Sequence, residues 1–350
     1  MAVSLDELRK LKYIAVDTIG DRTVNLMPLW DGEQWHSWFP GDDRLFKLAM
    51  HDVVVGEYLG KAAATSSDWY VPFLAFAWQR ASWPEVFHLW RHLPDDLHHF
   101  ATCTAKLEHF HEHRAAIGHG VSAFVQTELE YLFVLARSVF DLQQELISRV
   151  WSKRVRLLDP VAEVRRKGRP LPLSFPKIVL RDKQDVRSAE DIATVFGLSP
   201  RLAGAYAGAG KFFCGLREVR DAIVHSGTSV DMIFVTDQGF GVHRDLPALR
   251  TFGLSLRPQE GSTNVVPLMP LVAHVVFGTL GACDAIIDAL AQDVQFPPEL
   301  APDYSVFLRG FHNEALLRLK AVYEDAFRSS TRVGPLDESM VASSPRVSRP

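Results

Sequence analysis

The chain has 350 residues, of which 47% are hydrophobic and 23% charged, with a formal net charge of −4. This length allows one large domain or two modest ones with a sizeable core. The slightly acidic balance excludes a protein that binds polyanions over its whole surface. Any contact with nucleic acid must therefore come from a local basic patch.

Cysteine usage and hydropathy suggest a compartment. The three cysteines have neither an even count for disulfide pairing nor the spacing of a metal site: Cys103, Cys214 and Cys283. The start of the chain lacks a basic region followed by an apolar core, and no run of about 18 apolar residues follows. The longest apolar run, 265–280, is broken by two prolines and a histidine and predicts a buried helix. We expect a cytoplasmic protein without a membrane segment.

Residues 1–83 predict a small module that contains β-strands. Segments 12–17 and 23–27 cluster β-forming residues around a turn at Gly20 and Asp21, which predicts a hairpin. Further short strands are expected near 35–39 and 52–55. Four tryptophans are expected to anchor the core of this module, with an aromatic platform for stacking bases as the alternative: Trp30, Trp35, Trp38 and Trp69.

From residue 84 the hydrophobic period becomes helical. Apolar residues at three- and four-residue intervals, such as Leu129, Leu132, Phe133 and Ala136, indicate a buried stripe. Between the third and fourth helices, 230–235 and 237–243 predict a β-hairpin. The predicted helices cover 94–113, 126–153, 201–225, 267–292 and 313–328.

A group of histidines near residue 110 raises the question of a metal site. Glu108 and His111 stand three residues apart, and His109 and His113 stand four apart, so each pair shares a helix face. A di-iron centre would need a second Glu-x-x-His pair, which this sequence lacks. We expect a polar, solvated helix face without a bound metal or cofactor.

The segment 149–187 concentrates positive charge, with twelve basic and four acidic residues. Three prolines between residues 170 and 176 favour an exposed, mobile loop that joins the second and third helices. Such a loop could capture a phosphate backbone, or it could be a solvated linker. The residues assigned to RNA binding are Arg165, Arg166, Lys167 and Arg169.

The clearest candidate for chemistry lies at the end of the third helix, where Arg220 and Asp221 precede His225. At about 100° per residue, Arg217, Asp221 and His225 share one helix face, whereas Arg220 lies roughly 140° from His225. A carboxylate one turn before a histidine can fix its tautomer and raise its basicity. Ser226 and Gly227 should end the helix, which places His225 at a terminus.

The residues of this motif suit phosphate chemistry. The planar fork of Arg220 fits a phosphate that gains charge in the transition state. On the second helix, Asp141 interrupts an apolar stretch. We expect Asp141 to pair with a basic side chain of a neighbouring helix, with a place in the active cleft as the alternative.

The motif and the order of the helices resemble the HEPN superfamily of helical domains, which includes metal-independent ribonucleases. The resemblance covers residues 94 to 293. It implies a mainly α fold, with a HEPN-like helical bundle, an inserted β-hairpin and the small N-terminal module. The expected division is 1–83, then the helical domain 84–328, then a disordered tail over 329–350.

The same resemblance implies an endoribonuclease that leaves 2′,3′-cyclic phosphate and 5′-hydroxyl ends. Its catalytic residues would be Arg220, His225 and Asp221. The expected partners are RNA, a second copy of the chain and a neutralising protein, as in stress or anti-phage effectors. The alternative is a non-catalytic protein of the same family that dimerises, binds a nucleotide or acts as a scaffold.

Overall fold

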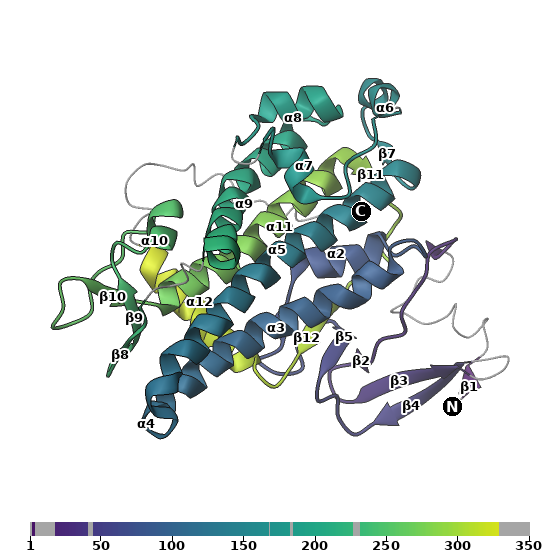
Figure 1. Cartoon of the computed structure of the whole chain (residues 1–350). Helices are drawn as coiled ribbons and strands as arrows, with labels where there is room; N and C mark the ends of the chain where they lie inside the picture. Colours follow the sequence, from purple (N-terminus) through teal and green to yellow (C-terminus); the bar gives the residue numbers. More distant parts are fainter. Residues whose placement is uncertain are drawn as a thin grey trace.

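The computed structural model describes residues 2–3, 18–40, 45–167, 169–182, 185–226 and 232–328. Of these, 56% are helical, and long helices cross the centre of the molecule (Figure 1). In chain order the helices are α2 (Pro72–Arg80), α3 (Phe87–Glu112), α4 (Arg114–Ile117), the 3-10 turn η2 (Gly118–Gly120), α5 (Val121–Lys153), α6 (Pro160–Arg166), α7 (Phe175–Val179), α8 (Ala189–Phe196), α9 (Pro200–Ser226), α10 (Pro247–Thr251), α11 (Met269–Asp293) and α12 (Asn313–Arg328).

The five predicted helices are confirmed as α3, α5, α9, α11 and α12, although α3 and α5 both begin earlier than predicted, α5 at Val121 instead of residue 126. The sequence places the start of α3 at Pro94, because proline is common in a first helical turn. Instead α3 begins at Phe87 and Pro94 lies inside it. Pro94 is buried in the core, so packing outweighs the hydrogen bond that a proline inside a helix forgoes.

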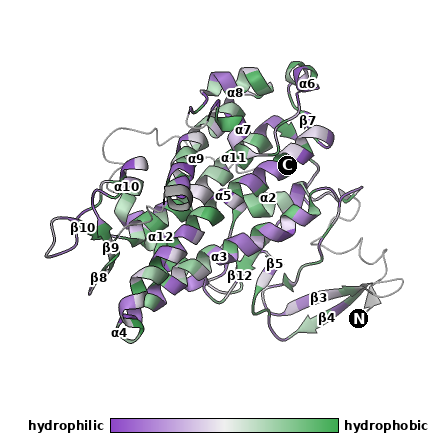
Figure 2. Cartoon of the chain, viewed as in Figure 1, coloured by the Kyte–Doolittle hydropathy of each residue, from purple (hydrophilic) through white to green (hydrophobic). Residues whose placement is uncertain are grey.

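The centre of the molecule is built on α5, which packs against α3, α9 and α11. Its stripe of Leu129, Leu132, Phe133 and Ala136 is almost completely buried. Green hydrophobic and purple hydrophilic segments alternate along α3 and α5 in Figure 2, as expected for helices with one buried face. The core positions therefore follow directly from the three-four spacing.

The helix α11 is long and apolar enough, by length and composition, to cross a membrane. However, 61% of its most apolar window is buried inside the protein, and the core helix of a soluble protein passes the same test. It packs against α5, α9 and α12. This matches the buried helix predicted from the broken apolar run.

The prediction of a mainly α fold is wrong, because the chain also builds a seven-stranded mixed sheet and two smaller sheets. The large sheet has the order β1-β4-β3-β2-β5-β12-β6. Its strands are short and come from both ends of the chain, which hides them from a search for local periodicity. They are β1 (Ala2–Val3), β2 (Leu29–Trp30), β3 (Trp35–Pro40), β4 (Leu45–Met50), β5 (Gly56–Gly60), β6 (Trp69–Tyr70) and β12 (Ser305–Arg309).

The strand β12 connects the two ends of the sequence. It pairs antiparallel with both β5 and β6, so a C-terminal strand lies inside the N-terminal sheet. One continuous hydrophobic core extends from Met27 to Leu319. Residues 18–83 are therefore joined to the helices by a shared sheet and a shared core, and the boundary at residue 83 stays a prediction.

Strand predictions in the N-terminal region had mixed outcomes. The strand near 35–39 is confirmed as β3, but 23–27 forms neither strand nor helix, and the strand expected at 52–55 begins instead at Gly56. The other half of the predicted hairpin, 12–17, lies outside the described residues, as does the tail 329–350. Hydrogen bonds of 23–27 run elsewhere, for example from the Thr23 amide to the Ser82 carbonyl at 2.9 Å.

Two of the four N-terminal tryptophans are buried anchors, as predicted, because Trp35 and Trp38 are each 5% exposed. Trp35 meets Tyr58 edge to face with ring centroids 4.7 Å apart, and Tyr58 stacks on Phe307 of β12 at 5.5 Å. Aromatic packing thus joins β3, β5 and β12 across the sheet.

The predicted hairpin after α9 is confirmed as β8 (Phe234–Thr236) and β9 (Gly239–His243). A third strand, β10 (Val265–Pro267), joins β9 and was not predicted. Gly239 follows the turn with φ of 120°, a conformation that side chains rarely adopt. Glycine is therefore needed where β9 begins.

The prediction that 149–187 is an exposed loop is wrong. The segment contains the end of α5, the short strand β7 (Arg156–Leu157), α6 and α7, and β7 pairs with β11 (Val294–Gln295). Pro160 and Pro176 lie in the first turns of α6 and α7, where proline is favoured rather than disruptive. Phe175 and Ile178 fix α7 in the core.

Candidate functional site

The helix α9 carries the predicted motif and lies tightly against its neighbours. Its Gly215 leaves no room for a side chain, since a Cβ there would lie 2.9 Å from Cε1 of Phe252. Phe213 and Leu216 are fully buried. Close packing on this face leaves Arg217, Arg220 and Asp221 on the partly exposed side of the last turns.

Asp221 binds arginines within the described structure. Its Oδ1 accepts a hydrogen bond from Nη1 of Arg220 at 2.9 Å, and its Oδ2 lies 3.4 Å from Nε of Arg217. Burial acts to raise the pKa of the Asp221 carboxyl, but the hydrogen bonds from Arg220 and Arg217 outweigh it and hold that pKa below its ordinary value. Asp221 is therefore ionised and forms ion pairs with both arginines.

The third member of the motif lies at the helix end. α9 extends to Ser226, so residue 225 belongs to its last turn, as predicted. The His225 side chain lies outside the described residues. The predicted contact between Asp221 and His225 accordingly stays a prediction.

Arg220 opens onto a groove of about 610 Å³. Most of its lining residues come from α5, and Leu173 and Ser174, just before α7, also line it. The lining mixes both charge signs with hydroxyl and apolar groups: Val134, Arg137, Ser138, Asp141, Leu142, Glu145, Leu173, Ser174 and Arg220.

Asp141 is the most perturbed titratable group of this groove. Burial raises the pKa of its carboxyl above the ordinary value, although a hydrogen bond from the Phe175 amide at 3.2 Å opposes that rise. Its ion pair is with Arg137 of the same helix at 3.7 Å, which corrects the expected partner on a neighbouring helix. A carboxyl with a raised pKa beside cations suits proton transfer near a phosphate.

The four residues assigned to RNA binding do not act as one basic patch. Arg166 is only 11% exposed and pairs with Glu163 at 2.8 Å, while it also donates to the carbonyls of Trp151 and Val155. Its guanidinium lies over the Trp151 ring. Arg166 is therefore part of the scaffold that fixes α6 to the end of α5, and its assignment to RNA binding is not favoured by these contacts.

The other three residues make fewer internal contacts than Arg166. Arg165 and Arg169 line a pocket of about 560 Å³, and Lys167 and Arg169 line an adjoining hollow of about 360 Å³, which Arg166 also borders. Arg169 donates to the Thr194 carbonyl at 2.8 Å, whereas Arg165 has no polar partner within the described part of the chain. These cations remain accessible to an anionic ligand.

The basic hollow and the Arg220 groove both lie along α5. Trp151 and Ser152 of α5 line the hollow, and the groove is lined by α5 between residues 134 and 145. The chain from Pro170, in the hollow, reaches Ser174 in the groove within four residues. Between them the chain at Leu171 and Pro172 lies against α5, where its carbonyls accept hydrogen bonds from Ser148 and Gln144.

Sequence reasoning offered Asp141 of α5 as an alternative member of the cleft and missed the other α5 residues of the groove, such as Arg137 and Ser138. The spacing of Arg137 and Asp141 indicates that they share a helix face, but it gives no information about the distance to Arg220. Comparison of the chain with protein-family profiles, curated proteins and solved structures finds no match. The chemistry must therefore be argued from these residues themselves.

Proposed function

We propose that the chain is a metal-independent endoribonuclease of the HEPN type. The observation that carries the proposal is that Arg220 of the motif helix lines one groove with Asp141, a carboxyl whose pKa burial raises. A fixed cation stabilises charge on a phosphate, and burial makes the Asp141 carboxyl hold a proton more readily than an exposed aspartate does. The groove thus unites two of the functions that RNA cleavage requires.

The reaction needs no covalent enzyme intermediate. The ribose 2′-oxygen attacks phosphorus and the bond to the 5′-oxygen breaks. One group takes the 2′-hydroxyl proton and another protonates the departing 5′-oxygen. We assign these proton transfers to His225 and Asp141, and the stabilisation of phosphoryl charge to Arg220, with Asp221 as the group that positions it. Products are a 2′,3′-cyclic phosphate and a 5′-hydroxyl.

RNA reaches this groove along α5. Lys167 and Arg169 hold the backbone at the basic hollow and Arg165 holds it at the adjoining pocket, and the strand then passes Ser174 to reach Arg220. The accessible cations give affinity without base readout, because phosphate contacts carry no sequence information. Arg166 stays in its internal contacts throughout.

The remaining features of the proposal rest on the family resemblance. Two chains form a homodimer in which both motif helices border one cleft. The enzyme acts in the cytoplasm as a stress or anti-phage effector, and a protein partner neutralises it. No membrane takes part.

One observation favours the alternative of a non-catalytic dimerisation, nucleotide-binding or scaffold protein. Asp221 contacts both Arg217 and Arg220, so part of the motif's positive charge is neutralised within the helix. A structural ion-pair network of this kind needs no substrate.

Incubation of the purified full-length chain with RNA in EDTA distinguishes the two functions. The nuclease yields fragments that end in 2′,3′-cyclic phosphate, whereas the same sequence as DNA stays intact because it lacks the 2′-hydroxyl. If an end-labelled RNA remains uncut when protein and RNA are present in equal amounts, the nuclease proposal is wrong and the non-catalytic function stands. A 3′-hydroxyl end would point to a contaminating or different nuclease and would refute the mechanism.

A further inference from the structure

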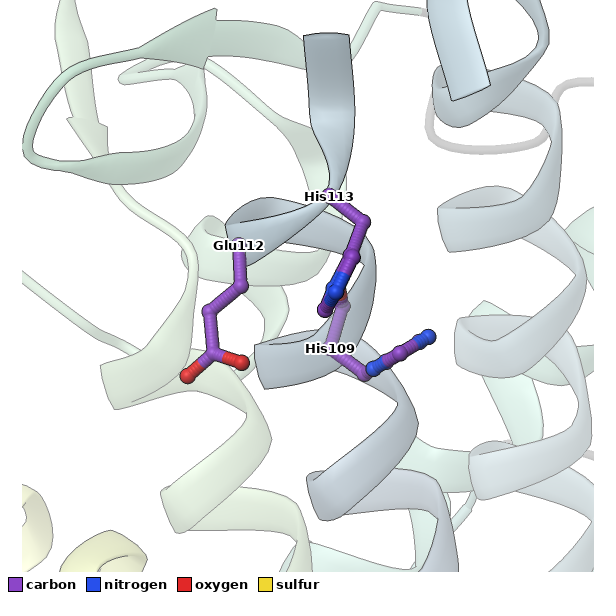
Figure 3. Close-up of side chains that lie close together, drawn as sticks. All are labelled: His109, Glu112 and His113. Carbon is purple, nitrogen blue, oxygen red and sulfur yellow. The ribbon is translucent and has the colours of Figure 1, made fainter. Parts of the chain in front are cut away.

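The end of α3 gathers three metal-binding side chains that the proposed ribonuclease does not use. His109, Glu112 and His113 each offer one ligand atom, and these atoms lie within 4.8 Å of one another. All three residues are exposed. Figure 3 shows them projecting from the same turn, with the His113 imidazole between the other two side chains.

One hydrogen bond fixes the tautomer of His113. Its Nδ1 lies 3.1 Å from the backbone carbonyl oxygen of His109. A carbonyl oxygen only accepts, so Nδ1 carries the proton and Nε2 keeps a free lone pair. Zinc-binding histidines are commonly oriented in this way by a carbonyl that accepts from the second ring nitrogen.

The other two ligands are also available. Neither His109 nor Glu112 makes a side-chain hydrogen bond or ion pair within the described residues. The nearby cation Arg318 of α12 is held by Glu108, with Nη2 at 2.5 Å from Oε2. Arg114 points toward the β8–β9 hairpin, where it contacts Asp237 at 3.2 Å.

The position on the helix also favours a cation. α3 has 26 residues and ends at Glu112, with His113 as its C-cap. The C-terminus of a helix carries partial negative charge, which stabilises positive groups within the last turn. Two histidines four residues apart on one helix face are a known arrangement for zinc.

We propose that His109, Glu112 and His113 form a binding site for a late first-row divalent ion, of which zinc is the test case. Two imidazole nitrogens select zinc, nickel or copper over calcium and magnesium, and the carboxylate adds a third ligand. Bonds of about 2.0 to 2.2 Å require the ligand atoms to approach one another, and rotation of exposed side chains permits this. Water completes the coordination. The site is independent of the proposed ribonuclease activity.

Calorimetric titration of the EDTA-stripped, full-length chain with zinc chloride tests the site. The wild type shows a saturable binding event, and His113→Ala weakens it by at least about tenfold. His109→Ala has a similar effect, and Glu112→Gln a smaller one. The matched control is His119→Ala in η2, an exposed histidine outside the cluster, which binds zinc as the wild type does.

Two outcomes overturn the proposal: no saturable binding by the wild type, or unchanged affinity in His113→Ala. X-ray absorption at the zinc edge adds a second criterion. It should report nitrogen and oxygen neighbours with imidazole scattering, whereas sulfur neighbours would assign the ion to a cysteine and refute the site. Because the three residues are exposed, the variants keep the wild-type circular dichroism spectrum.

Discussion

Two arginines of this protein, Arg166 on α6 and Arg220 on α9, are both assigned to the candidate RNA site from the sequence and differ in what surrounds their charges. Arg166 is 11% exposed, and Glu163 and two backbone carbonyls accept its hydrogen bonds. Arg220 is 29% exposed, has Asp221 as its partner and borders an open groove. The same functional group is structural in one place and available to a ligand in the other.

The difference shows that positive charge in a sequence is a poor guide to binding unless its partners are known. A guanidinium whose donors are all filled can bind a phosphate only by giving up several hydrogen bonds. A guanidinium with one partner and an open side keeps donors free. Substitutions on both helices test this contrast.

The greatest change in activity is expected at the end of α9. His225→Ala should reduce RNA cleavage by about 10²- to 10⁴-fold, because it removes a proton-transfer group. Single-turnover cleavage of an end-labelled RNA in EDTA measures the rate. A helix-terminal substitution costs little in packing, so the melting temperature should stay close to that of the wild type. Full activity in this variant would show that His225 is not catalytic and that the end of α9 has a structural role, as Arg166 does.

Arg166→Ala should lower the free energy of unfolding by about 2 kcal/mol, because it removes charge-assisted hydrogen bonds and leaves Glu163 unpaired. Urea unfolding followed by tryptophan fluorescence measures the change. The control is Arg165→Ala, one residue away and without a polar partner in the described part of the chain, which should unfold as the wild type does. An equal free energy of unfolding for Arg166→Ala and Arg165→Ala would show that Arg166 is no more structural than the accessible Arg165.

The same ion pair predicts a pH dependence. The hydrogen bond from Arg166 is the main cause that lowers the pKa of Glu163 to about 2 from an ordinary value of 4.5. The folded state therefore binds fewer protons than the unfolded state in this range, so the stabilisation is complete above pH 4.5 and is lost as the pH falls toward 2. The stability difference between wild type and Arg166→Ala should shrink over this window. A stability difference between wild type and Arg166→Ala that stays constant from pH 5 to pH 3 would contradict the role of this ion pair.

Arg220→Lys should retain RNA binding and lower the cleavage rate by about tenfold or more, since an ammonium lacks the planar fork. Arg217→Lys should be nearly silent, because an ion pair with Asp221 at i+4 contributes only about 0.2 to 0.5 kcal/mol. Single-turnover rates and filter-binding affinities separate the two effects. An inactive Arg217 variant beside an active Arg220 variant would move the catalytic role to Arg217.

A weaker effect is expected for the accessible cations near α6. The double variant Arg165→Glu with Lys167→Glu should flatten the dependence of RNA affinity on salt by about 0.7 unit of log-log slope for each phosphate that the variant no longer binds. Arg166 stays unchanged in this variant, because its replacement would disturb the fold. A slope equal to that of the wild type would show that this surface does not bind RNA.

Local patterns made the helices predictable and showed only part of the large sheet, including β3. The stripe on α5 lies within one helix, so spacing alone identifies it. The strand β6 has only two residues, and β12 finds its partners among residues of the N-terminal region. Because β12 and its partners are far apart in the sequence, their pairing produces no periodic pattern within either segment. The prolines of α6 and α7 show a second limit, because the same residue starts a helix or interrupts one according to its position.

The candidate site was only half predictable for the same reason. Arg220 and Asp221 follow from the motif, and α9 ends near residue 225 as expected. Asp221 contacts Arg217 and Arg220, which lie one turn and one residue before it, while its predicted contact with His225 involves a side chain outside the described residues. Arg137 and Asp141 enter the groove through the packing of α5 against α9, which no spacing within either helix specifies.

The position of β12 has a consequence for synthesis of the chain. A ribosome makes β5 and β6 long before residues 305–309 emerge, so both strands leave the exit tunnel without the strand that separates them. Until then their open edges can pair with other chains. Release of a chain that stops before β12 would leave this gap permanently unfilled. Completion of the seven-stranded sheet therefore requires translation through residue 309.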